Sequence, residues 1–285
     1  MSAIPSSLRS KMEESLVFKK GNNISILDIV PVSGGCINNT SKILTNEGSY
    51  FLKWNIDCDK NMFDLEKKGL DMLGSAQSIQ TPQIISIESE YLLMDFIETV
   101  NVNTSSWEEA GRAIAELHQI SSKSFGLDYN NFIGTLIQDN QQKDMWVDFY
   151  INQRIYPQLL SGNFPLSTIH LFEKFFINVE KFFPEECPSL LHGDFWQGNF
   201  LMSTDGIFLI DPAIYFGFRE MDIAMTKLFG GFNNRFYEAY HEHFPLAEGW
   251  EERVDICNLY PLLVHANLFG GSYHSQLISI VKRFV

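Results

Sequence analysis

One short stretch, residues 190–212, carries the residue types that phosphoryl transfer requires. It reads LLHGDFWQGNFLMSTDGIFLIDP and contains His192 and Asp194 in an HxD pattern, Asn199 five residues after the aspartate, and Asp211 at the end of a hairpin pattern. Phosphoryl transfer from ATP needs a carboxylate that orients an acceptor hydroxyl and takes its proton, and oxygen ligands for magnesium. We predict that Asp194 has the first role and that Asn199 and Asp211 have the second.

The spacing within this stretch makes the prediction specific. A lone HxD would indicate an ordinary polar turn, whereas HxDxxxxN followed by a hairpin and an aspartate has the spacing of a kinase catalytic loop. Gly193 and Gly198 suit a tight loop whose backbone comes close to a substrate. The Asp205-Gly206 step predicts a hairpin turn that returns the chain, and with it Asp211, towards Asn199.

Two features nearer the amino terminus could bind phosphate. Gly34 and Gly35 lie between two strand patterns, where backbone amides can approach phosphate oxygens, although most glycine pairs of this kind are simple turns. Lys53 follows on the third strand and could contact the α- and β-phosphates; the alternative is a solvent-facing strand lysine. Cys36, in the same loop, is either a thiol whose oxidation would inhibit ATP binding or an inert small residue.

Glu66 is expected to pair with Lys53 and hold it towards the nucleotide. It lies on the helix after the third strand; Asp64 is an alternative partner, and a solvated helix face is the simpler explanation for both. A later strand, YLLMDFI, would lead into the connection that binds adenine. The backbone expected to bind the adenine edge is that of Asp95, Phe96 and Ile97.

The elements that would position these residues follow from hydrophobic periodicity. The first part of the chain predicts a helix at 6–20, strands at 24–32, 39–45 and 49–55, a helix at 59–76, and strands at 83–89 and 91–97.

From residue 100 onward helices dominate. Ser105 with Glu108, and Ser106 with Glu109, have the spacing of a capping box at the start of a helix. Further helical patterns cover 144–160, 167–183, 221–243 and 251–270, and one strand pair, 199–203 and 206–211, interrupts them. The chain therefore predicts an α+β, bilobal, protein-kinase-like fold: a small antiparallel sheet lobe (1–97) that binds nucleotide and a larger helical lobe (98–285) that carries the catalytic loop.

Composition restricts the partners. The chain has 285 residues, 45% of them hydrophobic, and a net charge of -14, so its field should repel nucleic acid and anionic membranes. The four cysteines form no CxxC pair, and no stretch has the length and apolarity of a signal h-region or a membrane span. We therefore expect a cytoplasmic protein with no nucleic-acid or membrane partner. Its oligomeric state does not follow from the sequence.

With these residues assembled, residues 25–280 resemble the fructosamine kinase (ketosamine-3-kinase) family of the protein-kinase-like superfamily. LLHGDFWQGN is similar to the family's HGDLWSGN loop, and IDPAIYFGFREMDIAMTKLFGGF and the carboxyl end to NLFGGSY are similar to later family segments. The resemblance implies ATP- and Mg2+-dependent phosphorylation of the sugar 3-hydroxyl of ketosamines, which are adducts of aldoses with amines, in a deglycation system. The substrates it implies are ribulosamine, erythrulosamine or fructosamine adducts, free or protein-bound.

The resemblance also assigns roles to single residues. It implies that Asp194 is the proton acceptor, Lys53 the phosphate-binding lysine and Glu66 its partner. Asp222 would brace the catalytic loop, and Trp196 would either wall the sugar site or anchor the loop. The departures from the family pattern are Ser33 in the glycine loop, Phe195 for the commoner leucine and Gln197 for the commoner serine.

Two alternative functions remain open. A kinase of the same fold could act on an aminoglycoside or on choline, and the acidic charge would suit such cationic acceptors. A catalytically inactive pseudokinase could sense nucleotide instead. Loss of Lys53, Asp194, Asn199 or Asp211 would mark a pseudokinase, and all four are present.

Overall fold

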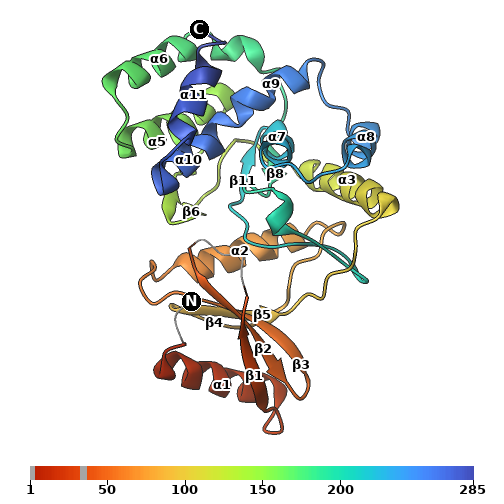
Figure 1. Ribbon diagram of the computed structural model, residues 1–285. Coiled ribbons are helices and arrows are strands. Elements are labelled where there is room, and N and C mark those ends of the chain that lie inside the picture. The colour runs from red at the N-terminus through yellow and green to blue at the C-terminus, as the bar shows by residue number, and fades with distance from the viewer. Residues whose placement is uncertain (1–3, 33–36) are drawn as a thin grey trace.

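The structure is a computed structural model that describes residues 4–32 and 37–285. Figure 1 shows a part built around one β-sheet and, beside it, a larger part built mostly of helices. The arrangement confirms the predicted α+β, kinase-like fold class. The predicted phosphate-loop residues Gly34 and Gly35, and Cys36 beside them, lie outside the described residues.

The sheet has five antiparallel strands in the spatial order β1-β2-β3-β5-β4. Each strand was predicted from its pattern. The strands are β1 (Ile26–Pro31), β2 (Asn39–Thr45), β3 (Gly48–Trp54), β4 (Ile84–Glu88) and β5 (Tyr91–Asp95). The predicted flanking helices are also present, as α1 (Ser6–Lys20) and α2 (Met62–Gly74).

The two helices cover opposite faces of the sheet (Figure 1). Leu52 of the central strand β3 packs in one apolar cluster with α1 residues such as Met12. On the other face, Phe63 and Leu70 of α2 pack against β5. Because side chains alternate along a strand, Lys53 points to the face opposite Leu52, which is the face that α2 covers.

The second part is mainly helical, as predicted. Its α-helices are α3 (Thr104–His118), α4 (Trp146–Phe149), α5 (Tyr156–Ser161), α6 (Leu166–Phe176), α7 (Glu220–Leu228), α8 (Asn234–His243), α9 (Trp250–Cys257), α10 (Leu259–Phe269) and α11 (Tyr273–Val281). A π-helical turn, η1 (Tyr150–Ile155), joins α4 to α5, and two 3₁₀ turns, η2 (Val179–Phe182) and η3 (Gln197–Asn199), complete the set. Within the described ranges, none of the helices combines the length and apolarity that crossing a membrane requires.

Several helix predictions need correction. The pattern at 251–270 forms two helices, α9 and α10, the pattern at 144–160 contains the π-helical turn η1 between α4 and α5, and the pattern at 167–183 divides into α6 and η2. Helix α3 begins at Thr104, and its cap is Asn103, whose Oδ1 accepts a hydrogen bond from Ser106 N at 3.0 Å. The predicted caps Ser105 and Ser106 therefore lie inside the helix. The pattern at 221–243 forms two helices, because Gly230 and Gly231 adopt left-handed backbone angles (φ 71° and 95°) that end α7.

The prediction of a single strand pair in this part was also incomplete. The expected hairpin is β9 (Phe200–Ser203) with β10 (Gly206–Leu209). Residues 98–285 also contain the antiparallel pairs β6 (Asn131–Ile133) with β7 (Leu136–Gln138), and β8 (Ser189–Leu191) with β11 (Tyr215–Gly217). Each of these strands has three residues, too few for an alternating pattern to be recognised.

The apolar core does not divide cleanly at the predicted lobe boundary. Leu73 at the end of α2, and Ala76 and Ile79 after it, pack into the large cluster of the helical part. Helix α2 therefore joins the two parts, and the division into 1–97 and 98–285 stays a prediction.

Helix α3 packs so closely on α8 that residue 111 has to be glycine. A Cβ atom at Gly111 would lie 2.3 Å from the backbone oxygen of Phe236. We predict that Gly111→Ala destabilises the protein by ~1–3 kcal/mol, because the strain outweighs alanine's higher helix propensity. Urea unfolding measures this, with the exposed Glu109→Ala on the same helix as the control; an unchanged or higher stability would contradict the close packing.

Candidate functional site

A cleft of about 920 Å³ lies between the sheet and the helical part. Its lining includes β2, β3, α2 and the segment after β5 on one side, and the catalytic loop, α7, α10 and α11 on the other. The volume is at the upper end of the range usual for ligand sites. The cleft therefore has room for a nucleotide and an acceptor together.

Lys53 lies buried in this cleft between two carboxylates. Its Nζ donates to Glu66 Oε1 at 3.0 Å and Oε2 at 2.8 Å, and to Asp211 Oδ1 at 2.9 Å. Glu66, rather than Asp64, is thus the partner on α2. Burial alone would lower the pKa of the ammonium, but the charges of Asp211 and Glu66 outweigh it and raise the pKa above its ordinary value. Lys53 is therefore a fixed positive charge, suited to phosphate.

Asp194 and Asn199 are joined directly. Asn199 Nδ2 donates to both the backbone oxygen and Oδ2 of Asp194, each at 2.9 Å. Burial, and then the negative charge of Asp211, raise the pKa of the Asp194 carboxyl to about 7, although the hydrogen bond from Asn199 opposes this. A carboxylate with a pKa near neutrality is suited to accept a proton from a hydroxyl.

Two antiparallel strand pairs, β8 with β11 and β9 with β10, bring these groups together. Strand β8 leads into the catalytic loop, and β11, which pairs with it, follows Asp211. Past the end of the β8–β11 pair, Ala213 N donates to His192 O at 2.9 Å, and past the end of the β9–β10 pair, Ile210 N donates to Asn199 O at 3.2 Å. Asn199 and Asp211 are thereby held on adjacent segments.

The backbone within these loops is tightly constrained. Asp211 has a left-handed φ of 53°, the only positive value outside glycine in the described residues. A Cβ at Gly193 (φ 81°) would lie 2.0 Å from Ala213 O. Glycine is required there because the two loops touch, and the unusual angle at Asp211 sits where a metal ligand is predicted.

His192 supports the loop and does not face a substrate. Its Nε2 donates to Ile210 O at 2.9 Å, and its Nδ1 accepts from Asp194 N at 3.2 Å. The side chain is buried, and burial lowers its pKa. A neutral imidazole therefore ties the loop to the segment that carries Asp211.

Asp222, on the first turn of α7, holds the loop from behind. Its Oδ2 accepts from His192 N at 2.7 Å and its Oδ1 from Gly193 N at 3.0 Å. Two further buried side chains that the sequence did not identify support Asp222: His118 contacts it, and Tyr240 contacts His118. His118 Nε2 lies 3.3 Å from Asp222 Oδ2, and His118 Nδ1 lies 2.8 Å from the hydroxyl of Tyr240. Helices α3, α7 and α8 thus meet at the carboxylate that fixes the loop.

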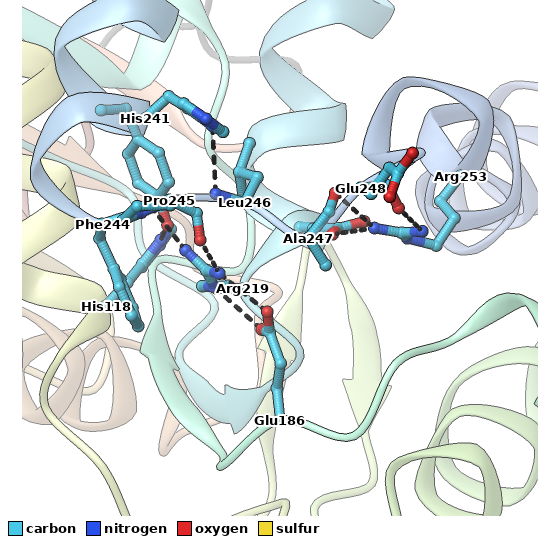
Figure 2. A network of polar contacts seen from close by, with 12 residues as sticks. His118, Glu186, Arg219, His241, Phe244, Pro245, Leu246, Ala247, Glu248 and Arg253 are labelled. Atoms are coloured by element: carbon cyan, nitrogen blue, oxygen red, sulfur yellow. Dashed lines mark hydrogen bonds and ion pairs between the residues drawn. The ribbon is translucent and has the colours of Figure 1, made fainter.

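A clamp of two arginines, again not predicted, holds the start of α7 (Figure 2). Arg219 makes two hydrogen bonds to Glu186, at 2.8 and 2.9 Å, and donates to the backbone oxygens of Phe244 and Pro245. Arg253 pairs with Glu220 and donates to backbone oxygens at 247 and 248. Charge-assisted, two-point pairs of this kind fix orientation as well as distance.

The connection after β5 also lines the cleft. Asp95 N donates to Gln83 O and Phe96 N donates to Ser49 O, so these two amides are occupied. Of the three residues, Ile97 is the one whose backbone N–H has no hydrogen bond within residues 4–32 and 37–285.

Lys42 of β2 makes a contact near this connection that the sequence did not indicate. Its Nζ lies 3.8 Å from the centre of the Phe96 ring and pairs with Glu98.

The donor set fits magnesium bound together with phosphate. No group of three histidine, cysteine or carboxylate ligands is found among residues 4–32 and 37–285. Asn199 and Asp211 supply two oxygen donors, and Mg2+ commonly takes one or two protein ligands and completes its shell with water and phosphate oxygens. A cation here would also oppose the rise in the pKa of Asp194.

Comparison with known proteins relates the chain to one family. The family model described as fructosamine kinase matches residues 9–285. An Enterococcus faecium protein named a probable ketoamine kinase is 36% identical over 266 residues, 90% of this chain and 95% of that protein. The chloroplastic protein-ribulosamine 3-kinase of Arabidopsis thaliana is 32% identical over 282 residues, 94% of this chain and 86% of that protein.

Solved structures agree with the sequence relatives. A Thermobifida fusca structure named as a fructosamine-3-kinase has a TM-score of 0.86 and 30% identity, covering 95% of this chain and 96% of that one. An ADP-bound aminoglycoside phosphotransferase has a TM-score of 0.65 and 16% identity, covering 99% of this chain and 97% of that one. At 16% identity, the likeness to the aminoglycoside phosphotransferase shows a shared fold and nothing more.

The double acceptor role of Asp222 leads to a stability prediction. In Asp222→Asn, one of the two backbone N–H groups loses its acceptor, since an amide has a single oxygen. We expect a loss of ~1–3 kcal/mol in the free energy of unfolding, as for a buried donor left unpaired. Urea unfolding of this variant beside the exposed Asp128→Asn checks it, and equal stabilities would rule out the bracing role.

Proposed function

Because this chain belongs to the fructosamine kinase family, we propose that it transfers the γ-phosphoryl group of ATP to the 3-hydroxyl of a ketosamine. The observation that carries the proposal is the convergence of Lys53, Asp194, Asn199 and Asp211 on one cleft. Lys53 with Glu66 supplies a fixed cation, and Asp194 supplies a base near neutral pH. These are the groups that phosphoryl transfer to an alcohol needs.

In the proposed mechanism the chain positions the reactants and neutralises charge. Lys53 binds phosphate oxygens, and the segment after Asp95 binds the adenine edge, with the N–H of Ile97 as donor. Asp194 orients the acceptor hydroxyl and takes its proton as the oxygen attacks phosphorus in line with the leaving ADP. Asn199 and Asp211 would hold Mg2+, which when bound supplies positive charge to the phosphates. Fixed charges of this kind stabilise the transition state without reorganisation.

The lining of the cleft favours a ketosamine over an aminoglycoside. Its acidic residues are Glu66, Asp95, Glu98, Asp194 and Asp211, which lie on the sheet side or in the catalytic segments. The part of the lining contributed by α7, α10 and α11 is apolar and aromatic, with His265, and includes no carboxylate. A polycationic aminoglycoside needs several anionic partners, whereas a ketosamine carries a single amine. The overall acidity of the chain therefore does not extend to this wall.

We predict that Asp194→Asn lowers turnover by ~10²-fold or more but leaves nucleotide affinity within about threefold, because the base is lost while Lys53 and the adenine connection are kept. Coupled-assay kinetics and calorimetric titration with ADP measure the two effects. The matched control is Asp205→Asn, in the exposed turn of the β9–β10 hairpin. Near-normal turnover would remove Asp194 from this role.

The substrate assignment is tested by incubating the protein with ATP and Mg2+ and, in turn, ribulosyl-lysine, fructosyl-lysine, choline and an aminoglycoside. We expect turnover on a ketosamine, with phosphorus NMR locating the new phosphate on the sugar 3-oxygen. Turnover confined to choline or the aminoglycoside would overturn the acceptor. Nucleotide binding without turnover on any of them would instead favour a nucleotide-sensing module.

A further inference from the structure

A row of aromatic rings runs along the helical wall of the cleft. Trp196 of the catalytic loop lies 5.9 Å from Phe229, and Phe229 lies 5.1 Å from His265, measured between ring centres. His265 lies in turn 5.5 Å from Phe269 and 5.3 Å from Tyr273. All five rings line the cleft. They connect the catalytic loop, through the end of α7, to α10 and α11.

Part of this aromatic row is uncovered. Phe229 is 43% exposed and Phe269 is 50% exposed, although the other residues that α7, α10 and α11 contribute to the cleft are buried or half-buried. Exposed aromatic faces grouped in a cleft commonly mark a surface that a ligand covers. The catalytic carboxylate Asp194 is two residues before Trp196, so such a ligand would lie next to the reacting hydroxyl.

The protonation of His265 follows from its contact with the backbone. Its Nδ1 lies 2.7 Å from the carbonyl oxygen of Pro261, which can only accept, so Nδ1 carries the hydrogen. Burial lowers the pKa of the ring, which favours the neutral form. In that tautomer Nε2 has a free lone pair and is a hydrogen-bond acceptor.

The helical wall of the cleft thus combines aromatic faces with a hydrogen-bond acceptor, and both suit an ammonium group. The faces of aromatic rings attract a cation, and Nε2 of His265 accepts a hydrogen bond. No carboxylate stands beside them in the described lining. A single ammonium with an N–H to donate satisfies both, whereas an anion or a second ammonium would find no partner.

We propose that this aromatic row binds the amine of the acceptor, and that Nε2 of His265 accepts a hydrogen bond from the protonated secondary amine. The inference rests on the proposed function and extends it from the hydroxyl that is phosphorylated to the group that distinguishes a ketosamine from a ketose. Asp194 acts at the sugar hydroxyl, and His265 is the specificity-determining residue at the amine. The site therefore selects adducts of amines over free or ether-linked sugars.

The test compares two acceptors that differ at one atom: N-butyl-ribulosamine and 1-O-butyl-ribulose, in which an uncharged ether oxygen replaces the nitrogen. We expect the wild type to favour the amine in kcat/KM. His265→Phe, which keeps an aromatic ring but removes the acceptor, should lower kcat/KM for the amine by ~10- to 100-fold, the value of a hydrogen bond to a charged group. For the ether, the kcat/KM of His265→Phe should stay within about threefold of the wild-type value.

Three further variants and one binding measurement keep the result unambiguous. His265→Gln, which restores an acceptor oxygen, should recover part of the preference, and Phe269→Leu should reduce it without altering the acceptor. His274→Phe is the matched control, because His274 packs on Phe164 and does not line the cleft. Calorimetric ADP affinity should be unchanged in every variant, which shows that the fold is kept.

The outcomes separate the two proposals. If the wild type uses amine and ether equally, or if His265→Phe lowers both by the same factor, the role of His265 is overturned while the ketosamine kinase function stands. If the wild type phosphorylates neither acceptor nor any other ketosamine, the proposed function fails, and this inference fails with it.

Discussion

The buried ammonium of Lys53 is the interaction on which the site depends. A cation at this depth is costly to bury unless carboxylates surround it. Along the chain, Glu66 lies 13 positions and Asp211 158 positions from Lys53, and the two carboxylates come from opposite sides of the cleft. Strand β3, helix α2 and the segment after β10 must therefore hold fixed positions relative to one another. The contact that neutralises Lys53 also places the predicted phosphate-binding and metal-binding groups together.

A second constraint follows from how the catalytic segments touch. The loop after β8 and the segment after β10 are hydrogen-bonded to each other, Gly193 has no room for a side chain, and Asp211 adopts a left-handed angle. Such a conformation persists only where the surroundings over-determine it. Asp222, supported by His118 and Tyr240 and by the arginine clamp at the start of α7, is the part of the surroundings that does this.

The sequence predicted those features whose signals are local. Alternation identified the five strands of the sheet, and the fixed spacing from His192 to Asn199 identified the catalytic loop, because consecutive residues determine both. It did not predict the short strands, the cap at Asn103 or the break at Gly230, where one residue outweighs the pattern around it. It also missed His118, which contacts Asp222 and Tyr240 on helices distant in sequence, and the ring contacts of His265 with Phe229 and Tyr273 on the wall of the cleft.

Acceptor selectivity has to come from individual side chains, because a fold alone does not determine function. An aminoglycoside phosphotransferase of 16% identity shares the fold of this chain. The wall formed by α7, α10 and α11 contributes no carboxylate, and of these helices α10 and α11 lie late in the chain, away from the groups that handle phosphate. Within the described residues, the wall residues on α10 and α11 make none of the hydrogen bonds that hold Lys53 or Asp222. In the proposed arrangement α10 and α11 select the amine of the acceptor, and the row of rings reaches the catalytic loop at Trp196 through Phe229.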